Sequence, residues 1–281
     1  MKTIRIIPRL DIKGPNLVKG IHLEGLRVLG KPGSFAKFYY EQGADELMFM
    51  DVVASLYERN SLDKIISETA KSIFIPITVG GGIRNLTDIR NVLRAGADKV
   101  SINTAAIKDP SFIKKASKEF GSSTIVVAIE AIKQPSGKYF AFTDNGREFT
   151  GVEVVEWARQ VDSLGAGELI ITSVDNEGTG KGFDMALLNE ISGAVTIPVI
   201  AHGGAGNINH VMEVLRAGHI DAVSVASILH YETVKYLKDT FADLDEGNFD
   251  FVLSGKSFQI FSPVKLGEMK QVLHENNFNC R

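Results

Sequence analysis

Cysteine is almost absent from this chain, whose 281 residues contain a single one, Cys280. One cysteine excludes an internal disulfide framework and a zinc site built on several thiolates, and it favours a reducing compartment. Long hydrophobic runs are missing too, because no apolar stretch approaches the roughly 20 residues that a membrane-spanning helix needs. Residues 1–7 lack the apolar core of a signal peptide. We therefore expect a cytoplasmic protein.

A strong excess of charge of one sign is also missing. The formal net charge is −3, which makes a broad nucleic-acid-binding or membrane-binding surface improbable. The sequence is 44% hydrophobic and 23% charged, which is ordinary for a globular protein and argues against disorder. Its length suits one large α/β domain or two small ones.

What the chain does contain is an internal repeat. Residues 43–47 return as 165–169, residues 93–96 return as 215–218, and both pairs are offset by 122 positions (165 − 43 and 215 − 93). The Ile-Pro and Gly-Gly pairs of residues 75–82 recur at the same offset. Agreement of several blocks at one spacing indicates a duplicated half-domain. We place the two halves at about 1–120 and 121–235.

Short apolar segments alternate with longer amphipathic ones, most of which end near a glycine. The segments predicted as strands are Arg5–Asp11, Glu46–Asp51, Ile75–Val79, Lys99–Ile102, Ile125–Glu130, Glu168–Thr172, Val199–Ala201 and Ala222–Val225. The predicted helices are Ser34–Glu41, Ser61–Ser72, Asn85–Ala95, Pro110–Phe120, Val152–Leu164, Asp184–Ser192 and Asn207–Ala217. Two four-strand halves predict a (β/α)₈ TIM barrel that forms a single domain over 1–281. An open doubly wound sheet is the alternative, but it does not explain the duplication.

Three segments fall outside this rhythm. Residues 139–146 alternate large and small side chains and end in Asp-Asn-Gly, which predicts a small hairpin after the fifth strand. Residues 239–263 are an insertion, which we interpret as a surface cover. Residues 263–276 are predicted to form a final helix.

Two acids end corresponding strands of the two halves. Asp11 ends strand one and Glu130 ends strand five. Active sites of this fold form at the C-terminal ends of the strands, where these two acids should face each other. Two opposed carboxyls, one protonated and one ionised, form a general acid/base pair. Each acid taken alone is better explained as a helix cap or a partner of a lysine, so the hypothesis rests on the matched pair.

Glycine-rich turns follow strands three and seven, and polar residues end strands four and eight. Glycines let backbone N–H groups approach an anion, although any tight turn also needs glycine. Because the arrangement occurs in both halves, it predicts two phosphate sites on opposite sides of the mouth. The substrate should then be long, with a phosphate at each end. The residues concerned are Gly81, Gly82, Asn103, Thr104, Gly203, Gly204, Ala226 and Ser227.

Four charged residues open strands at the other end of the predicted barrel. They are Arg5, Glu46, Lys99 and Glu168. From the residues alone, a plain ring of ion pairs that closes the core is the leading interpretation.

Taken together, these motifs resemble the cyclase subunit of imidazole glycerol phosphate synthase, over roughly residues 4–235. The resemblance rests on the segments Ile6–Asp11, Val18–Gly20, Asp45–Leu47, Asp51–Ser55, Thr78–Ile83, Ala97–Ala106 and Gly165–Leu169. It implies a glutaminase partner bound as a heterodimer at the barrel bottom, with ammonia passing up the interior. The ammonia then attacks a bisphosphorylated ribulosyl-formimino carboxamide ribonucleotide at the top. We expect no cofactor and no metal ion.

By this resemblance each candidate residue acquires a role. Asp11 and Glu130 become the acid/base pair, Lys19 a substrate contact, and the four charged residues a gate on the ammonia path. The substrate-binding and phosphate-binding set is Lys19, Gly81, Gly82, Asn103, Thr104, Glu177, Gly178, Gly203, Gly204, Ala226 and Ser227. A glutaminase partner is expected because this chain has no cysteine placed to hydrolyse glutamine.

Four positions depart from the family pattern, and all lie near the top of the barrel. Glu130 and Glu177 stand where aspartate is usual, Arg9 where cysteine is usual, and His202 where serine is usual. Arg9 should either point into the barrel wall or turn toward the mouth, where it would lower the pKa of Asp11. These departures keep a second hypothesis open, an ammonia-channelling paralogue that serves a sugar amidotransferase in cell-surface polysaccharide synthesis.

Overall fold

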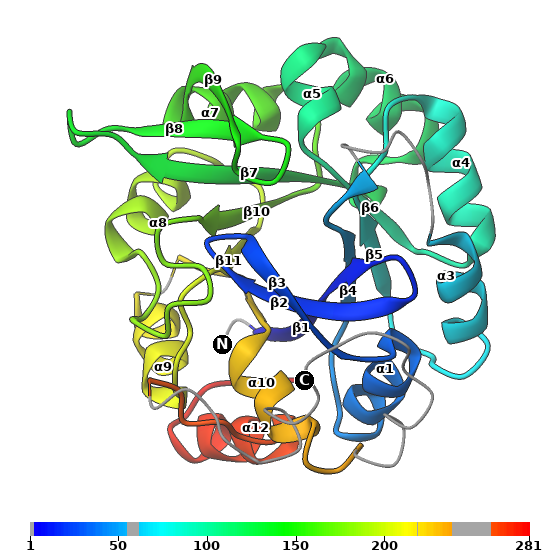
Figure 1. The fold of residues 1–281 in the computed structure, drawn as a ribbon. Helices are drawn as coiled ribbons and strands as arrows, with labels where there is room; N and C mark the ends of the chain where they lie inside the picture. Colours follow the sequence, from blue (N-terminus) through cyan, green and yellow to red (C-terminus); the bar gives the residue numbers. More distant parts are fainter. Residues whose placement is uncertain (1–2, 55–61, 218, 238–259) are drawn as a thin grey trace.

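The computed structural model describes residues 3–54, 62–217, 219–237 and 260–281. Within them, eight parallel strands close into a barrel, because the pairing of β10 with β7 completes the ring (Figure 1). Around the ring the order is β1 (Arg5–Lys13), β4 (Leu47–Asp51), β5 (Ile77–Gly80), β6 (Lys99–Ile102), β7 (Ile125–Lys133), β10 (Glu168–Ser173), β11 (Val199–His202) and β12 (Ala222–Val225). The predicted (β/α)₈ barrel is confirmed and the open sheet is wrong.

Helices surround the barrel (Figure 1). Those described are α1 (Pro32–Glu41), α3 (Asp63–Thr69), α4 (Leu86–Ala95), α5 (Thr104–Lys108), α6 (Ser111–Phe120), α7 (Val154–Ser163), α8 (Met185–Ser192), α9 (Ile208–Arg216), α10 (Ser227–Thr233) and α12 (Leu266–Glu275), with a short 3₁₀ turn η1 (Ser122–Thr124). The short helices α5 and α10 were not predicted. The final helix is confirmed as α12. Most of the predicted insertion, residues 238–259, lies outside the described residues.

Asparagine side chains start two helices at equivalent places in the two halves. Asn85 accepts a hydrogen bond from the Asp88 backbone N–H at the start of α4, and Asn207 accepts one from His210 at the start of α9. Such caps satisfy backbone donors that the first helical turn leaves without partners. The two caps lie 122 positions apart (207 − 85), which is the offset of the sequence repeat.

Two antiparallel hairpins rise from the barrel mouth. The first consists of β2 (Asn16–Ile21) and β3 (Glu24–Gly30), and the second of β8 (Tyr139–Thr143) and β9 (Glu148–Glu153). The second was predicted over 139–146, but it runs further and shifts the start of α7 to Val154. The first was not predicted.

The two hairpin turns share one unusual geometry. His22 and Leu23 have φ of 54° and 62°, and Asp144 and Asn145 have φ of 53° and 62°, all in the left-handed region. The pairs are offset by 122 positions (144 − 22), so they are repeat mates. Aspartate, asparagine and to some extent histidine tolerate this region, whereas leucine rarely adopts it. The first turn was therefore not recognisable from its residue types.

Because side chains point alternately inward and outward along each strand, the core has two parts. One set of side chains packs between the strands and the surrounding helices, with Phe35, Phe49 and Trp157 among the largest buried ones. The other set points into the barrel and consists of Ile7, Met48, Val126, Ala128, Ile170, Ile200 and Ala222. The interior of the barrel is thus apolar over its middle section.

Candidate active site

The inward-facing residues change in character along the barrel axis. On β1 they run Arg5, Ile7, Arg9, Asp11, because side chains two apart in a strand share a face. Strand β10 repeats this order of charged, apolar and polar side chains with Glu168, Ile170 and Thr172. The barrel therefore has a charged lower end, an apolar middle and a polar upper end.

The charged lower end is a closed ring of ion pairs. The Arg5 guanidinium lies 3.0 Å from both Glu46 and Glu168, and the Lys99 ammonium lies 3.0 Å from Glu46 and 3.2 Å from Glu168. Thr78 donates a further hydrogen bond of 2.5 Å to Glu46. The structure thus brings together all four residues predicted there and adds Thr78, which no sequence pattern indicated.

Asp11 is held by an arginine at the upper end of β1. Arg9 Nε donates a 2.7 Å hydrogen bond to Asp11 Oδ1, and both side chains are almost fully buried. Burial by itself would raise the pKa of Asp11, but the charges of Arg9 and Lys19 outweigh it and the pKa lies below its ordinary value. Of the two orientations considered for Arg9, the structure has the one that faces the mouth.

Glu130 lies opposite, in a different electrostatic environment. Three strands separate β7 from β1 in either direction around the ring, so the two acids project from opposite walls. Burial raises the pKa of Glu130 to about 7, although the Gly146 backbone N–H donates a 2.8 Å hydrogen bond to its carboxylate. At neutral pH, Asp11 is therefore ionised while Glu130 is partly protonated.

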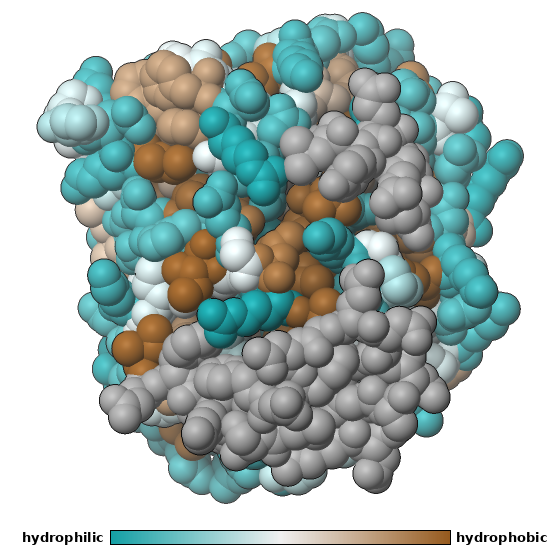
Figure 2. Space-filling view, viewed as in Figure 1, coloured by the Kyte–Doolittle hydropathy of each residue, from teal (hydrophilic) through white to brown (hydrophobic). Residues whose placement is uncertain are grey.

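A cavity of about 380 Å³ opens above the first half of the barrel, between β1 and β7. It is lined by Glu130, Arg9 and four of the predicted phosphate residues, Gly81, Gly82, Asn103 and Thr104. Arg84 and Lys108 also line it and were not singled out in the sequence. Arg84 lies two residues after Gly82 and Lys108 ends α5, and because both are cationic they suit an anionic group in this cavity. Figure 2 shows apolar surface at the centre of this face, flanked by hydrophilic residues.

The second set of predicted phosphate residues lies outside that cavity. Gly203 and Gly204 follow β11, while Ala226 and Ser227 stand at the N-terminal end of α10. The loop after β10 packs directly against this turn, since the Gly182 N–H donates a 2.8 Å hydrogen bond to the Gly204 carbonyl. A Cβ atom on Gly204 would lie 1.9 Å from the Gly182 oxygen, so only glycine fits there.

The β2–β3 hairpin is fastened across the mouth by a buried ion pair. Lys19 contacts Glu177, whose other oxygen accepts a 3.0 Å hydrogen bond from the Leu23 N–H. Asn145, in the turn of the second hairpin, donates a 2.8 Å hydrogen bond to the Leu23 carbonyl. A Cβ on Gly178 would come within 2.5 Å of the Gly20 oxygen, which reflects how closely the loop and hairpin pack. Lys19 and Glu177 thus hold each other.

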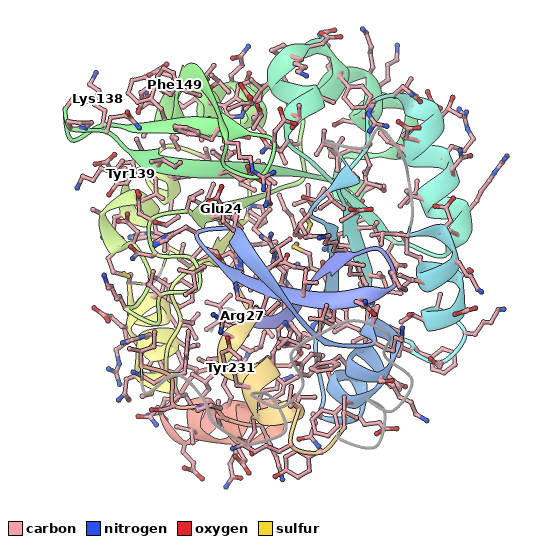
Figure 3. The ribbon with its side chains drawn as sticks, in the orientation of Figure 1. Glu24, Arg27, Lys138, Tyr139, Phe149 and Tyr231 are labelled. Carbon is pink, nitrogen blue, oxygen red and sulfur yellow. The ribbon has the colours of Figure 1, made fainter. Side chains whose placement is uncertain are left out.

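A smaller cavity of about 200 Å³ lies beside this hairpin, over α10. Glu24 and Arg27 reach it from β3, and Tyr231 reaches it from α10 (Figure 3). Lys19 lines it as well. In the part of the chain that the structure describes, no three His, Cys, Asp or Glu side chains are grouped to hold a metal ion. None of the described helices combines the length and apolar character needed to cross a bilayer.

Comparison with known proteins gives consistent matches. The model of a family described as "Histidine biosynthesis protein" matches residues 5–235. A Legionella pneumophila protein named "Imidazole glycerol phosphate synthase subunit HisF" is 57% identical over 208 residues, which are 74% of this chain and 98% of that protein. Proteins of the same name from Lactococcus lactis subsp. cremoris strains MG1363 and SK11 are 48% and 49% identical over 232 residues, which are 82% of this chain and 90% of each relative.

Proposed function

Since this chain belongs to the histidine biosynthesis protein family, we propose that it is the cyclase subunit of imidazole glycerol phosphate synthase. It uses ammonia from a glutaminase partner to convert a bisphosphorylated ribulosyl-formimino carboxamide ribonucleotide. The products are imidazole glycerol phosphate and aminoimidazole carboxamide ribonucleotide. The alternative of a conduit for a sugar amidotransferase has no support from these three relatives, which all carry the cyclase name.

The observation that carries this proposal is the pair of opposed acids with opposite pKa shifts. Asp11 is kept ionised, so it stabilises the positive charge that develops on the ammonia nitrogen during attack and then accepts a proton. Glu130 holds a proton up to a pKa of about 7, so it donates one to the departing oxygen. Two carboxyls with separated pKa values are the usual basis of an acid and a base in one site.

The cavity and the opposite turn suit the two phosphates of the substrate. The backbone N–H groups of Gly81 and Gly82, together with Asn103 and Thr104, would hold one phosphate in the larger cavity. Gly203, Gly204, Ala226 and Ser227 would hold the other at the ends of β11 and β12. Lys19, Glu177 and Gly178 would contact the middle of the substrate beneath the β2–β3 hairpin.

The lower end of the barrel suits the entry of ammonia. The ring of Arg5, Glu46, Lys99 and Glu168 surrounds the axis, and among the described residues the interior between this ring and Arg9 is lined mainly by apolar side chains. An apolar passage excludes charged species and protects a small neutral molecule from protonation. We assign these four residues as the ammonia gate and the surrounding face as the docking site of the glutaminase, in a heterodimer.

A direct assay tests this function. The purified protein, supplied with the bisphosphorylated ribonucleotide and an ammonium salt, is expected to release imidazole glycerol phosphate. Asp11→Asn should lower kcat by at least about 100-fold, because general acid/base and electrostatic groups contribute on that scale. Asp63→Asn, on the exposed start of α3, is the matched control and should leave kcat unchanged. Folded wild-type protein that makes no imidazole product would contradict the proposal.

A further inference from the structure

The polar upper end of the barrel contains side chains that the proposed acid/base chemistry does not use. Five inward-facing residues form what we term the upper polar ring: Arg9, Ser101, Thr172, His202 and Ser224. On β1, β10, β11 and β12, each ring residue stands two positions after an inward apolar residue of the same strand. Ser101, on β6, lines the same cavity as Arg9. The ring therefore separates the apolar interior from the mouth.

Arg9 crosses this level of the barrel. Its Nε is paired with Asp11 on β1, while its Nη1 donates a 3.4 Å hydrogen bond to Thr172 Oγ1 on β10. Strands β1 and β10 are separated by two strands in one direction and four in the other, so the Arg9 side chain reaches across part of the interior. A molecule that moves from the apolar interior to the cavity must pass beside it.

His202 presents an unprotonated ring nitrogen at the same level of the barrel. It pairs in register with Thr172, the residue that accepts the hydrogen bond from Arg9. The Nδ1 atom of His202 lies 2.9 Å from the Ser224 carbonyl oxygen, which can only accept, so Nδ1 carries the proton. Burial and the charge of Arg9 lower the pKa of His202 to about 3, so the ring is neutral at neutral pH. Its Nε2 is then an acceptor.

This acceptor and two hydroxyls of the upper polar ring, one on β12 beside it and one on β6 across the barrel, have no partner. Within the described residues, His202 Nε2, Ser224 Oγ and Ser101 Oγ are buried and make no hydrogen bond. Buried polar atoms are normally satisfied, so three unsatisfied ones around one axis indicate a small polar guest. The upper polar ring thus combines three potential acceptors with one guanidinium, which can only donate.

We infer that the upper polar ring is a holding site for one molecule of neutral ammonia. Ammonia has three N–H donors and one lone pair, which match three acceptors and one donor. Ammonium has no lone pair to accept from Arg9, and its charge is repelled by the guanidinium. The inference rests on the proposed function and adds a specific stop on the ammonia path, directly below Asp11. Arg9 and His202 are here positioning residues for ammonia.

The test measures where the nitrogen in the product comes from. The complex with the glutaminase is given glutamine labelled with ¹⁵N in its amide, together with an excess of unlabelled ammonium salt. The labelled fraction of the imidazole product then reports how well ammonia is retained inside the barrel. Wild-type complex is expected to give mainly labelled product. His202→Leu should lower the ratio of labelled to unlabelled product about five-fold, the scale of one lost hydrogen bond.

Two further variants serve as controls. His202→Gln keeps a side-chain oxygen as acceptor and should restore most of the labelled fraction. Ser224→Ala is a smaller change and serves if His202→Leu does not fold. It is also expected to lower the labelled fraction. An unchanged labelled fraction in both His202→Leu and Ser224→Ala would overturn the holding site. Equal loss of turnover from both nitrogen sources would also overturn it, because that result indicates damage to the acid/base pair. Absence of any wild-type product would instead refute the proposed function.

Discussion

Glu130 and Asp11 carry the same functional group, but their surroundings give the two carboxyls different pKa values. Both are carboxyls at the top of the barrel, yet burial raises the pKa of Glu130 to about 7 while Arg9 keeps that of Asp11 low. The division depends on Arg9, which is close enough to Asp11 for a direct 2.7 Å hydrogen bond. The base role of Asp11 therefore depends on a single guanidinium, and the acid role of Glu130 on burial.

The raised pKa of Glu130 predicts a pH-dependent stability. Between its ordinary pKa of 4.5 and about 7, the folded protein holds a proton that the unfolded chain releases. The free energy of unfolding therefore falls as pH rises through this window, by about 3 kcal/mol in total from this group. Glu130→Gln has no carboxyl to titrate, so its free energy of unfolding should not fall in this window. Relative to wild type, the variant should therefore become more stable by up to that amount between pH 4.5 and pH 8.

Urea unfolding at pH 4.5, 6 and 8 measures this difference. Glu213→Gln, on the exposed face of α9, is the matched control and should keep the wild-type dependence. If wild type and Glu130→Gln differ by the same free energy at all three pH values, the carboxyl is not protonated in the folded state as described.

At the scale of elements, the β2–β3 hairpin shapes the mouth. Its turn places His22 and Leu23 in the left-handed region, which costs about 1–2 kcal/mol per residue for side chains other than glycine. Contacts from Glu177 and Asn145 to Leu23 hold this turn in place. The hairpin is thus fixed by the rest of the mouth rather than by its own sequence.

The ion pair under this hairpin predicts a destabilised single variant and a recovered double variant. Lys19→Met leaves the buried Glu177 carboxylate without its ion-pair partner, which should lower the free energy of unfolding by about 3–5 kcal/mol. Adding Glu177→Gln removes the charge and keeps an acceptor for the Leu23 N–H, so stability should largely return. Turnover should not return with it, because the proposed substrate contact is still missing.

Chemical denaturation and steady-state kinetics on the same samples separate these effects. Lys37→Met breaks an exposed pair with Glu41 on α1 and should change stability by no more than about 0.5 kcal/mol. A double variant as unstable as Lys19→Met would show that the pair acts through something other than its charges.

At the scale of the whole molecule, the two ends of the barrel present different surfaces. Phe74 is 80% exposed and lies three residues before β5, at the end that carries the Arg5–Glu46–Lys99–Glu168 ring. Its neighbour Tyr40 packs edge-on at 6.3 Å between ring centroids. A large exposed aromatic side chain at the same end of the barrel as the gate is suited to anchor the glutaminase.

Phe74→Ala should therefore weaken glutaminase binding by at least about 30-fold, the effect expected from loss of an interface hot spot. Titration calorimetry with the purified partner measures the change. Phe149→Ala is the matched control, because Phe149 is 57% exposed but lies on the β8–β9 hairpin at the mouth (Figure 3). If both variants lose affinity equally, or if neither loses affinity, the glutaminase does not bind through Phe74.

The sequence by itself determined the barrel and the positions of its candidate residues. The repeat at one offset, the apolar strand segments and the charges at strand starts are local patterns, so they can be recognised along the chain. In a parallel barrel, strand ends converge on one face, and this places Asp11 and Glu130 on opposite walls without further information.

Only the tertiary structure decided what those residues do to one another. That Arg9 faces the mouth, pairs with Asp11 and reaches Thr172 depends on side-chain orientation across strands far apart in sequence. The His22–Leu23 turn is likewise stabilised by Glu177 and Asn145, which are distant along the chain. Charge coupling and strained backbone arise from proximity in space, and no pattern of neighbouring residues encodes them.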